Sequence, residues 1–200
     1  MLYPAADGKG VYAQSREAIH YFAVPGEGSN QTYNIPEAPI DPSLPLFGSS
    51  NYNWALSGSK LFWFCITDGQ LHSLDTATGA QSVVKTQEPV ISLSGIGGRL
   101  FGISENDPSV LLEIDPANGN TTHVVDLSAR IGKITNLGAN ITTDMRQTLA
   151  QTAQFIGIEA IWDDMLLAKL NGDMYAVYKF TDDSLMLLCG DQAPDAVKIT

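Results

Sequence analysis

Apolar and polar residues alternate along two segments of the chain that nearly repeat each other. The segments "LHSLDTATG" (residues 71–79) and "LLEIDPANG" (residues 111–119) both place apolar side chains at alternating positions before a polar turn that ends in glycine. Alternation with a period of two is typical of a strand with one buried face, and a turn that ends in glycine favours a tight hairpin. The pattern therefore predicts the same strand and turn twice.

A second apolar strand precedes each copy, as "SGSKLFWFCI" before the first and "IGGRLFGIS" before the second. Each of these strands follows a glycine turn, which completes a repeating unit of antiparallel strands. Asp75 and Asp115 come just before the glycine turns, where we expect them to accept backbone N–H bonds. Within the second unit, the alternation predicts four strands at about 90–95, 99–104, 109–114 and 120–127.

Weaker copies of the unit occur at both ends of the chain, beginning with "DGKGVYAQS" and "WDDMLLAKL". A four-stranded sheet with two apolar faces buries them by stacking against further sheets. The four copies predict an all-β fold, a β-propeller of about four blades that forms a single domain over residues 1–200 or part of a larger propeller. The strand-like ends "MLYPAA" and "DAVKIT" are expected to meet in one closing blade.

The two central signatures resemble the repeats of quinoprotein-like and related bacterial β-propellers, over about residues 52–127. Enzymes, binding proteins and scaffolds share such signatures, so the resemblance implies the fold and no particular activity. Because the chain offers no set of quinone contacts, no cofactor is expected.

Two segments depart from the repeat and are expected to be inserted loops. Residues 25–50 contain five of the ten prolines, which favours an extended connection between blades. Residues 128–155 include "TTDMRQTLAQTAQF", where Asp144 suits the first turn of a helix and Met145 and Leu149 share one face. One short helix is predicted there, packed on its own domain.

Charge and composition narrow the classes of partner. Eleven basic residues against 22 acidic ones give a net charge of −11, which argues against nucleic acid. The chain contains no apolar run of about 18 residues, so we expect a soluble protein without membrane insertion. Glycosylation sequons at Asn30, Asn120 and Asn140 would allow a secreted or extracytoplasmic location.

The positions of cysteine and histidine in the sequence indicate no particular chemistry. Cys65 and Cys189 lie in apolar strands and are expected to be buried thiols. The three histidines, His20, His72 and His123, fall in third or fourth strands, away from the expected ligand end, and lack metal-ligand spacing. The sequence therefore predicts neither a metal site nor a catalytic nucleophile.

Propellers place ligands at one end of the central axis, where the loops between second and third strands converge. In this chain each of those loops contributes a carboxylate, and one also contributes an arginine. An aromatic ring after the first inserted loop is expected to face the same mouth. The expected ligand-binding residues are Arg16, Tyr52, Asp68, Glu105 and Asp173, with Glu17 as a further carboxylate.

These features favour a non-enzymatic binding or scaffold module that presents the mouth loops to a protein or glycan partner. The alternative is a hydrolase or lyase that acts on a sugar-like substrate through two mouth carboxylates. If the four blades do not close on themselves, the propeller is expected to complete itself by oligomerising or within a longer chain.

Overall fold

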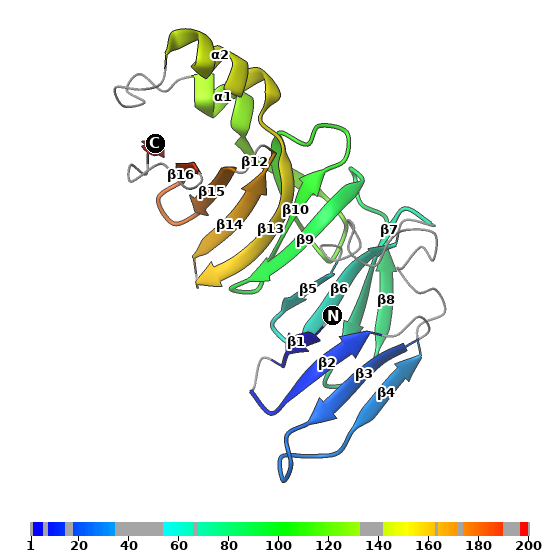
Figure 1. Ribbon diagram of the computed structural model, residues 1–200. Coiled ribbons are helices and arrows are strands. Elements are labelled where there is room, and N and C mark those ends of the chain that lie inside the picture. Colours follow the sequence, from blue (N-terminus) through cyan, green and yellow to red (C-terminus); the bar gives the residue numbers. More distant parts are fainter. Residues whose placement is uncertain are drawn as a thin grey trace.

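The computed structural model describes residues 2–5, 8–14, 18–34, 54–65, 68–132, 142–162, 164–171, 174–189 and 197–199. Its strands form four antiparallel sheets, each built from strands that follow one another in the chain. We call these sheets the first to the fourth blade. Figure 1 shows them in sequence order along a curved row. The predicted architecture of four stacked blades is confirmed.

The strand bounds are as follows. The first blade contains β1 (Leu2–Pro4), β2 (Gly10–Gln14), β3 (Ala18–Ala23) and β4 (Gln31–Asn34). The second contains β5 (Trp54–Ser57), β6 (Lys60–Cys65), β7 (Gln70–Asp75) and β8 (Gln81–Val84). The third contains β9 (Val90–Ile96), β10 (Arg99–Ser104), β11 (Val110–Ile114) and β12 (Thr121–Asp126). The fourth contains β13 (Phe155–Trp162), β14 (Met165–Leu170), β15 (Met174–Lys179), β16 (Ser184–Cys189) and β17 (Val197–Ile199).

The third blade matches its predicted strands to within two residues at every boundary. Gly97 and Gly98 connect β9 to β10 with φ values of 57° and 79°, which are left-handed values that favour glycine. Asp75 accepts hydrogen bonds from two backbone N–H groups of its turn, and Asp115 accepts one, as predicted. The turn chemistry read from the repeat is therefore confirmed in both central blades.

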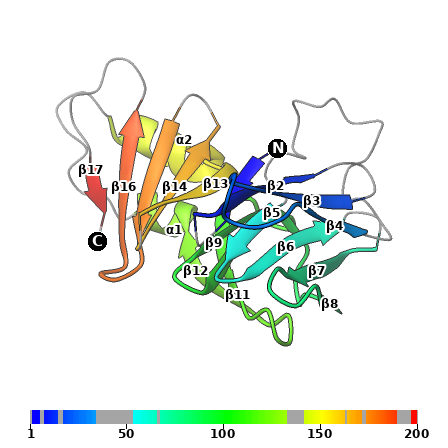
Figure 2. The same ribbon diagram turned by 90° about the horizontal axis from the view of Figure 1, so that it is seen from below.

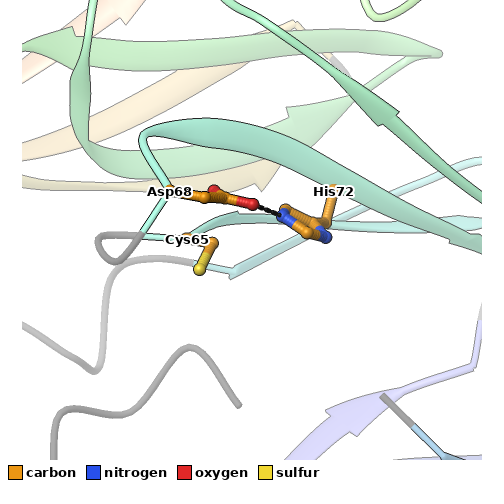
Figure 3. Close-up of side chains that lie close together, drawn as sticks. All are labelled: Cys65, Asp68 and His72. Carbon is orange, nitrogen blue, oxygen red and sulfur yellow. Dashed lines mark hydrogen bonds and ion pairs between the residues drawn. The ribbon is translucent and has the colours of Figure 1, made fainter. Parts of the chain in front are cut away.

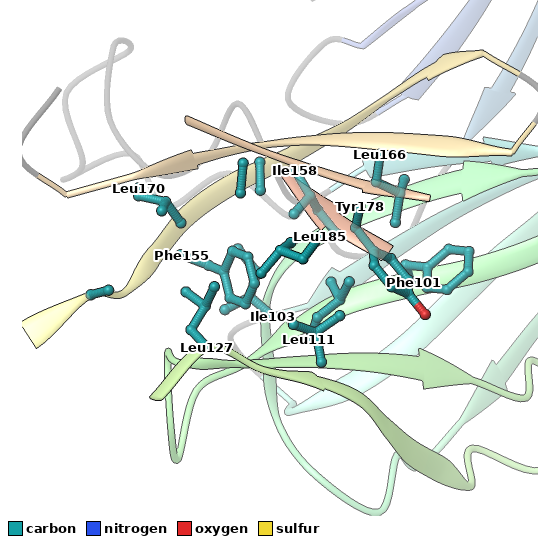
Figure 4. Close-up of a cluster of buried hydrophobic side chains, with 14 of the residues drawn as sticks. Phe101, Ile103, Leu111, Leu127, Phe155, Ile158, Leu166, Leu170, Tyr178 and Leu185 are labelled. Carbon is teal, nitrogen blue, oxygen red and sulfur yellow. The ribbon is translucent and has the colours of Figure 1, made fainter. Parts of the chain in front are cut away.

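Alternate residues of the second and third blades pack on opposite neighbours, and the core of the described residues consists of three clusters between consecutive blades. Ile19 of the first blade meets Trp63 of the second, while Phe62 of the second meets Leu112 of the third. The largest cluster joins the third and fourth blades and includes Phe101 and Leu166 (Figure 4). Among the described residues, no hydrophobic cluster joins the fourth blade to the first.

The face of the fourth blade that points away from the third carries apolar side chains together with the charged residues Glu159, Lys169 and Lys179. Residues paired directly across antiparallel strands share a face, and the registered set Leu167, Val177 and Met186 lies on the side opposite buried Leu166 and Tyr178. Trp162, paired with Met165, and Tyr175, paired with Lys169, lie on the same side and are 67% and 39% exposed. We call this surface, made of Trp162, Met165, Leu167, Tyr175, Val177 and Met186, the outer face of the fourth blade.

The first blade has a corresponding face on the side away from the second blade. Tyr12 and Ile19 point toward the second blade, so Val11 and Phe22, which pair in the alternate register, lie on the other side. Phe22 is 47% exposed. Both end faces of the row of four blades therefore include exposed aromatic side chains, Phe22 on the first blade and Trp162 and Tyr175 on the fourth.

The predicted helix is α2 (Thr143–Thr152), and Leu149 and Ala153 pack against the core between the third and fourth blades, as expected. The side chain of Met145 lies outside the described residues. A second, six-residue helix, α1 (Leu127–Gly132), precedes α2 and buries Leu127 and Ile131 in the same core.

The boundaries of the first inserted loop were predicted wrongly. Residues 31–34 form β4 and pair with β3, and only the stretch from residue 35 onward lies outside the described residues. The signal was weak because "QTYN" is an edge strand with three exposed residues and no apolar alternation.

The prediction that the two ends of the chain meet in one blade was also wrong. β1 pairs with β2 in the first blade, whereas β17 pairs with β16 in the fourth. Figure 2 shows β17 beside β16 on one side of the molecule, with β3 and β4 of the first blade on the other. Each terminal segment thus extends its own sheet.

Candidate functional site

Two of the five predicted ligand-binding residues lie within the described residues. Asp68 belongs to the loop between β6 and β7, and Glu105 to the loop between β10 and β11, so both occupy the same end of neighbouring blades. Both are exposed. The other three residues of the predicted mouth, Arg16, Tyr52 and Asp173, lie outside the described residues, as does Glu17.

Asp68 shapes its own turn. Its Oδ1 accepts a hydrogen bond of 2.9 Å from the backbone N–H of Gln70, an arrangement that aspartate commonly makes two residues ahead in a turn. Gly69, between them, has a φ of 67°, which suits glycine. The turn leaves Oδ2 of Asp68 directed along β7.

His72 lies against this carboxylate, contrary to the prediction that the histidines lie away from the ligand end. His72 Nε2 is 2.8 Å from Asp68 Oδ2 (Figure 3), because the turn carries Asp68 back over the start of β7. The imidazole also stacks on Trp63, with ring centroids 5.5 Å apart, and Trp63 stacks on Trp54 at 4.8 Å. The side chain of His72 is 13% exposed, so its position is fixed on two sides.

Cys65 completes this cluster. It ends β6 opposite Gln70, and it is a fully buried thiol, as expected for Cys65; Cys189 has no described side chain. The sulfur of Cys65, a carboxylate oxygen of Asp68 and a ring nitrogen of His72 all lie within 4.8 Å of one another. The spacing Cys-x2-Asp-x3-His across a hairpin was visible in the sequence, but it becomes a cluster only when the turn folds as it does here.

The sequence did not indicate a further acidic residue, Glu88. Glu88, in the connection from the second to the third blade, accepts hydrogen bonds from Ser104 at 3.1 Å and Thr121 at 3.3 Å, and lies 2.8 Å from His123 Nε2. Burial acts to raise the pKa of Glu88, but the bonds from His123 and Ser104 outweigh it and hold that pKa below its usual value. Glu88 therefore fastens the connection to the third blade.

A groove opens at the opposite end, between the first and second blades. It has a volume of about 430 Å³ and is bounded by the turns at residues 27–29, 58–59 and 76–77. Three tyrosines line it: Tyr12 and Tyr21, whose ring centroids are 5.0 Å apart, and Tyr33, whose hydroxyl donates to the Thr76 carbonyl at 3.1 Å. Burial raises the pKa of Tyr33, so its hydroxyl keeps its proton at neutral pH. The sequence did not indicate this groove, because the rings come from three separate strands.

Comparison with known proteins gives the fold. No known family profile matches the chain, and no curated protein sequence is similar to it. Among solved structures, the chain is similar to the β-propeller domain of Cps50 (Swd1) from Myceliophteria thermophila, with a TM-score of 0.53, 11% identity and 95% of this chain covered. It is similar to the WD40 repeats of RRP9 with a TM-score of 0.55, 11% identity and 98% covered. It is similar to YCF48 bound to D1 peptide with a TM-score of 0.54, 12% identity and 88% covered.

The chain covers 62%, 52% and 48% of these three proteins, so it spans about half of their length. The resemblance to quinoprotein-like propellers in particular gains no support from these matches. None of the described helices is long and apolar enough to cross a membrane. At these identities the similarity extends to the fold alone, and that fold is the β-propeller.

Proposed function

We propose that the chain is a protein-interaction propeller module, and that a second copy of the chain covers the faces at the two ends of its row of blades. The outer face of the fourth blade is the observation behind this proposal. It presents six apolar or aromatic side chains beside the charged residues Glu159, Lys169 and Lys179, and Trp162 and Tyr175 are 67% and 39% exposed. Exposed aromatic side chains surrounded by charged residues are typical of protein–protein contact sites.

The geometry of the repeat favours a particular docking mode. Within the chain, the face of one blade that carries Phe101 packs on the face of the next that carries Leu166 and Tyr178. By position, Val177 of the fourth blade and Phe22 of the first lie on the two faces that would meet if this stacking continued into another copy. We therefore propose head-to-tail packing, in which the fourth blade of one copy stacks on the first blade of its partner.

The number of blades is compatible with a closed pair. Two chains of four blades make eight, which is within the usual range of four to eight for β-propellers. The chain also spans about half the length of the propellers that it resembles. A head-to-tail interface closes into a ring when its rotation allows, and otherwise forms open chains of copies.

Sedimentation velocity over a range of concentrations tests the proposal. Wild-type chain should sediment with at least twice the mass of one chain at high concentration. Val177→Glu places a charge in the proposed interface and should shift the protein to single chains, because an unpaired buried charge opposes association. Val83→Glu is the matched control, since Val83 is 50% exposed but lies on β8, away from both end faces.

Loss of association in Val177→Glu but not in Val83→Glu supports the proposal. A wild-type protein that sediments as a single chain throughout would contradict it, and so would a Val177→Glu variant that associates like the wild type.

The mouth residues remain our proposal for contacts to further protein partners, and the tyrosine-lined groove is a second candidate surface. Tyrosine is enriched where proteins bind one another, which favours the groove for an extended segment of a partner. Peptides selected from a random library should lose binding to Tyr21→Ala if the groove binds them, and to Glu105→Ala if the mouth does. If both variants bind the peptides as tightly as the wild type does, both surfaces are excluded.

Glycan binding is the alternative for either surface, and a glycan array on the same variants distinguishes it. The hydrolase or lyase alternative needs two carboxylates that face one substrate. Asp68 already bonds Gln70 and His72, which does not favour a catalytic role for its carboxylate.

A further inference from the structure

We propose that Cys65, Asp68 and His72 form a binding site for a divalent transition-metal ion, and that Zn²⁺ is the ion their chemistry fits best. This inference is independent of how copies of the chain associate. Thiolate, imidazole and carboxylate are the three protein ligands that zinc uses, whereas calcium and magnesium prefer oxygen alone. The mixed set of one sulfur, one nitrogen and one oxygen therefore selects a borderline-soft cation.

The geometry requires a small adjustment. The three ligand atoms lie within 4.8 Å of one another. Zinc bonds of about 2.0 to 2.3 Å in a tetrahedron place ligand atoms roughly 3.3 to 3.6 Å apart. Asp68 Oδ2 and His72 Nε2 are 2.8 Å apart and must separate slightly, while the sulfur of buried Cys65 must lie within about 3.6 Å of both. Asp68 is exposed, so its carboxylate is free to make its part of this adjustment.

Two contacts already orient the ligands. The Gln70 N–H holds Oδ1 of Asp68 and leaves Oδ2 toward the imidazole, while Trp63 stacks on the ring of His72. Figure 3 shows the three side chains grouped at the hairpin end. Hydrogen bonds and packing contacts to metal-ligating side chains orient those ligands and strengthen metal binding.

Charge also favours a dication. With the thiol deprotonated, the cluster carries two negative charges and a neutral imidazole, so a divalent ion makes the half-buried site neutral. The net charge of −11 on the chain attracts cations at longer range. Three protein ligands leave the fourth position of a tetrahedron for water.

The third blade shows that the fold itself does not need these residues. Asp107 makes the same turn bond as Asp68, accepting from the N–H of Ser109 at 3.0 Å. The positions of Cys65 and His72 in the register are taken there by Ser104 and Leu112. The same turn bond therefore forms in the third blade without cysteine or histidine, so the turn does not depend on either residue.

Titration of the whole chain with Co²⁺ and Zn²⁺ tests the site. Bound Co²⁺ should give a thiolate charge-transfer band, and it should quench the fluorescence of Trp63, which stacks on His72. Zn²⁺ should displace the Co²⁺ at one ion per chain. His72→Ala and Asp68→Asn should each weaken binding by about 100-fold or more, since losing even an outer-sphere partner costs 10- to 100-fold.

His20→Ala is the matched control, because His20 occupies the equivalent register position of the first blade. It should bind the metal like the wild type. Cys65→Ser should abolish the charge-transfer band. Because Cys65 is buried, this substitution can prevent folding, and Asp68→Asn, at an exposed position, then still tests the site. Absence of one-to-one binding to the wild type, or binding that survives both His72→Ala and Asp68→Asn, would overturn the proposal.

Discussion

Replacing Gly95 with alanine tests how closely the second and third blades stack. Gly95 lies in β9, next to β5 of the second blade. A methyl group there would overlap the carbonyl oxygen of Leu56 and would lie 2.7 Å from its carbonyl carbon and 2.8 Å from Ser57 Cβ. Ordinary carbon–carbon contacts are about 3.5 to 4 Å, so one blade must move by about 1 Å.

The expected cost follows from two opposing effects. Overpacking typically costs about 1–3 kcal/mol, and the upper part of this range applies because backbone blocks the methyl group. Removing glycine stabilises the folded state by about 0.4–1 kcal/mol, since the unfolded chain loses freedom. The free energy of unfolding should therefore fall by about 2 kcal/mol, which lowers the melting temperature of a chain of this size by about 4–8 °C.

Thermal and urea unfolding followed by tryptophan fluorescence measures the change, because Trp54 and Trp63 lie in the second blade. Gly58→Ala is the control: a methyl group there meets nothing within 4 Å, and only its φ of 60° is unfavourable. That strain should cost about 1 kcal/mol. If Gly95→Ala is no more destabilising than Gly58→Ala, the two blades do not pack backbone against backbone.

Three further outcomes are expected. Arg99→Lys should destabilise the protein by about 1 kcal/mol in urea unfolding, because lysine loses the two-pronged bond to Glu113 and the stacking on Phe180 at 4.5 Å. Burial raises the pKa of Tyr178 from 10.0 in the unfolded chain to about 12 in the folded state. Between these two pH values the folded state keeps the phenol proton, whereas the unfolded state loses it. Stability should therefore fall as pH rises from about 10 to about 12, which Tyr178→Phe should lessen in unfolding experiments at high pH. Asp68→Ala should lower the melting temperature more than Glu105→Ala, because only Asp68 makes the turn and histidine bonds described above.

The sequence was sufficient for the two central blades, where local pattern and tertiary structure agree. In β10 and β11 the apolar alternation, the glycine hairpin and the Asp turn all indicate the same strands, and the structure forms them. The pattern failed at β4, whose polar edge strand carries little alternation beside a proline-rich stretch. Backbone pairing with β3 holds this exposed edge strand, and alternation of apolar residues does not signal such pairing.

The candidate sites were harder to predict for a related reason. His72 was assigned correctly to a third strand, but its contact with Asp68 depends on how the intervening turn folds back. The tyrosine-lined groove is formed by Tyr12, Tyr21 and Tyr33, which come from three different strands. In both cases the fold brings together residues whose spacing along the chain does not reveal that they are neighbours.

The faces at the two ends of the row offer the most direct test of the central claim. Val177→Glu places a charge on the outer face of the fourth blade, and Phe22→Glu places one on the corresponding face of the first blade. Each variant alone should therefore sediment as a single chain. An equimolar mixture still contains one intact pair of faces, because the first blade of the Val177→Glu chain meets the fourth blade of the Phe22→Glu chain. Head-to-tail packing of copies predicts that the mixture recovers two-chain species in sedimentation velocity; a mixture that stays at the mass of one chain would contradict it.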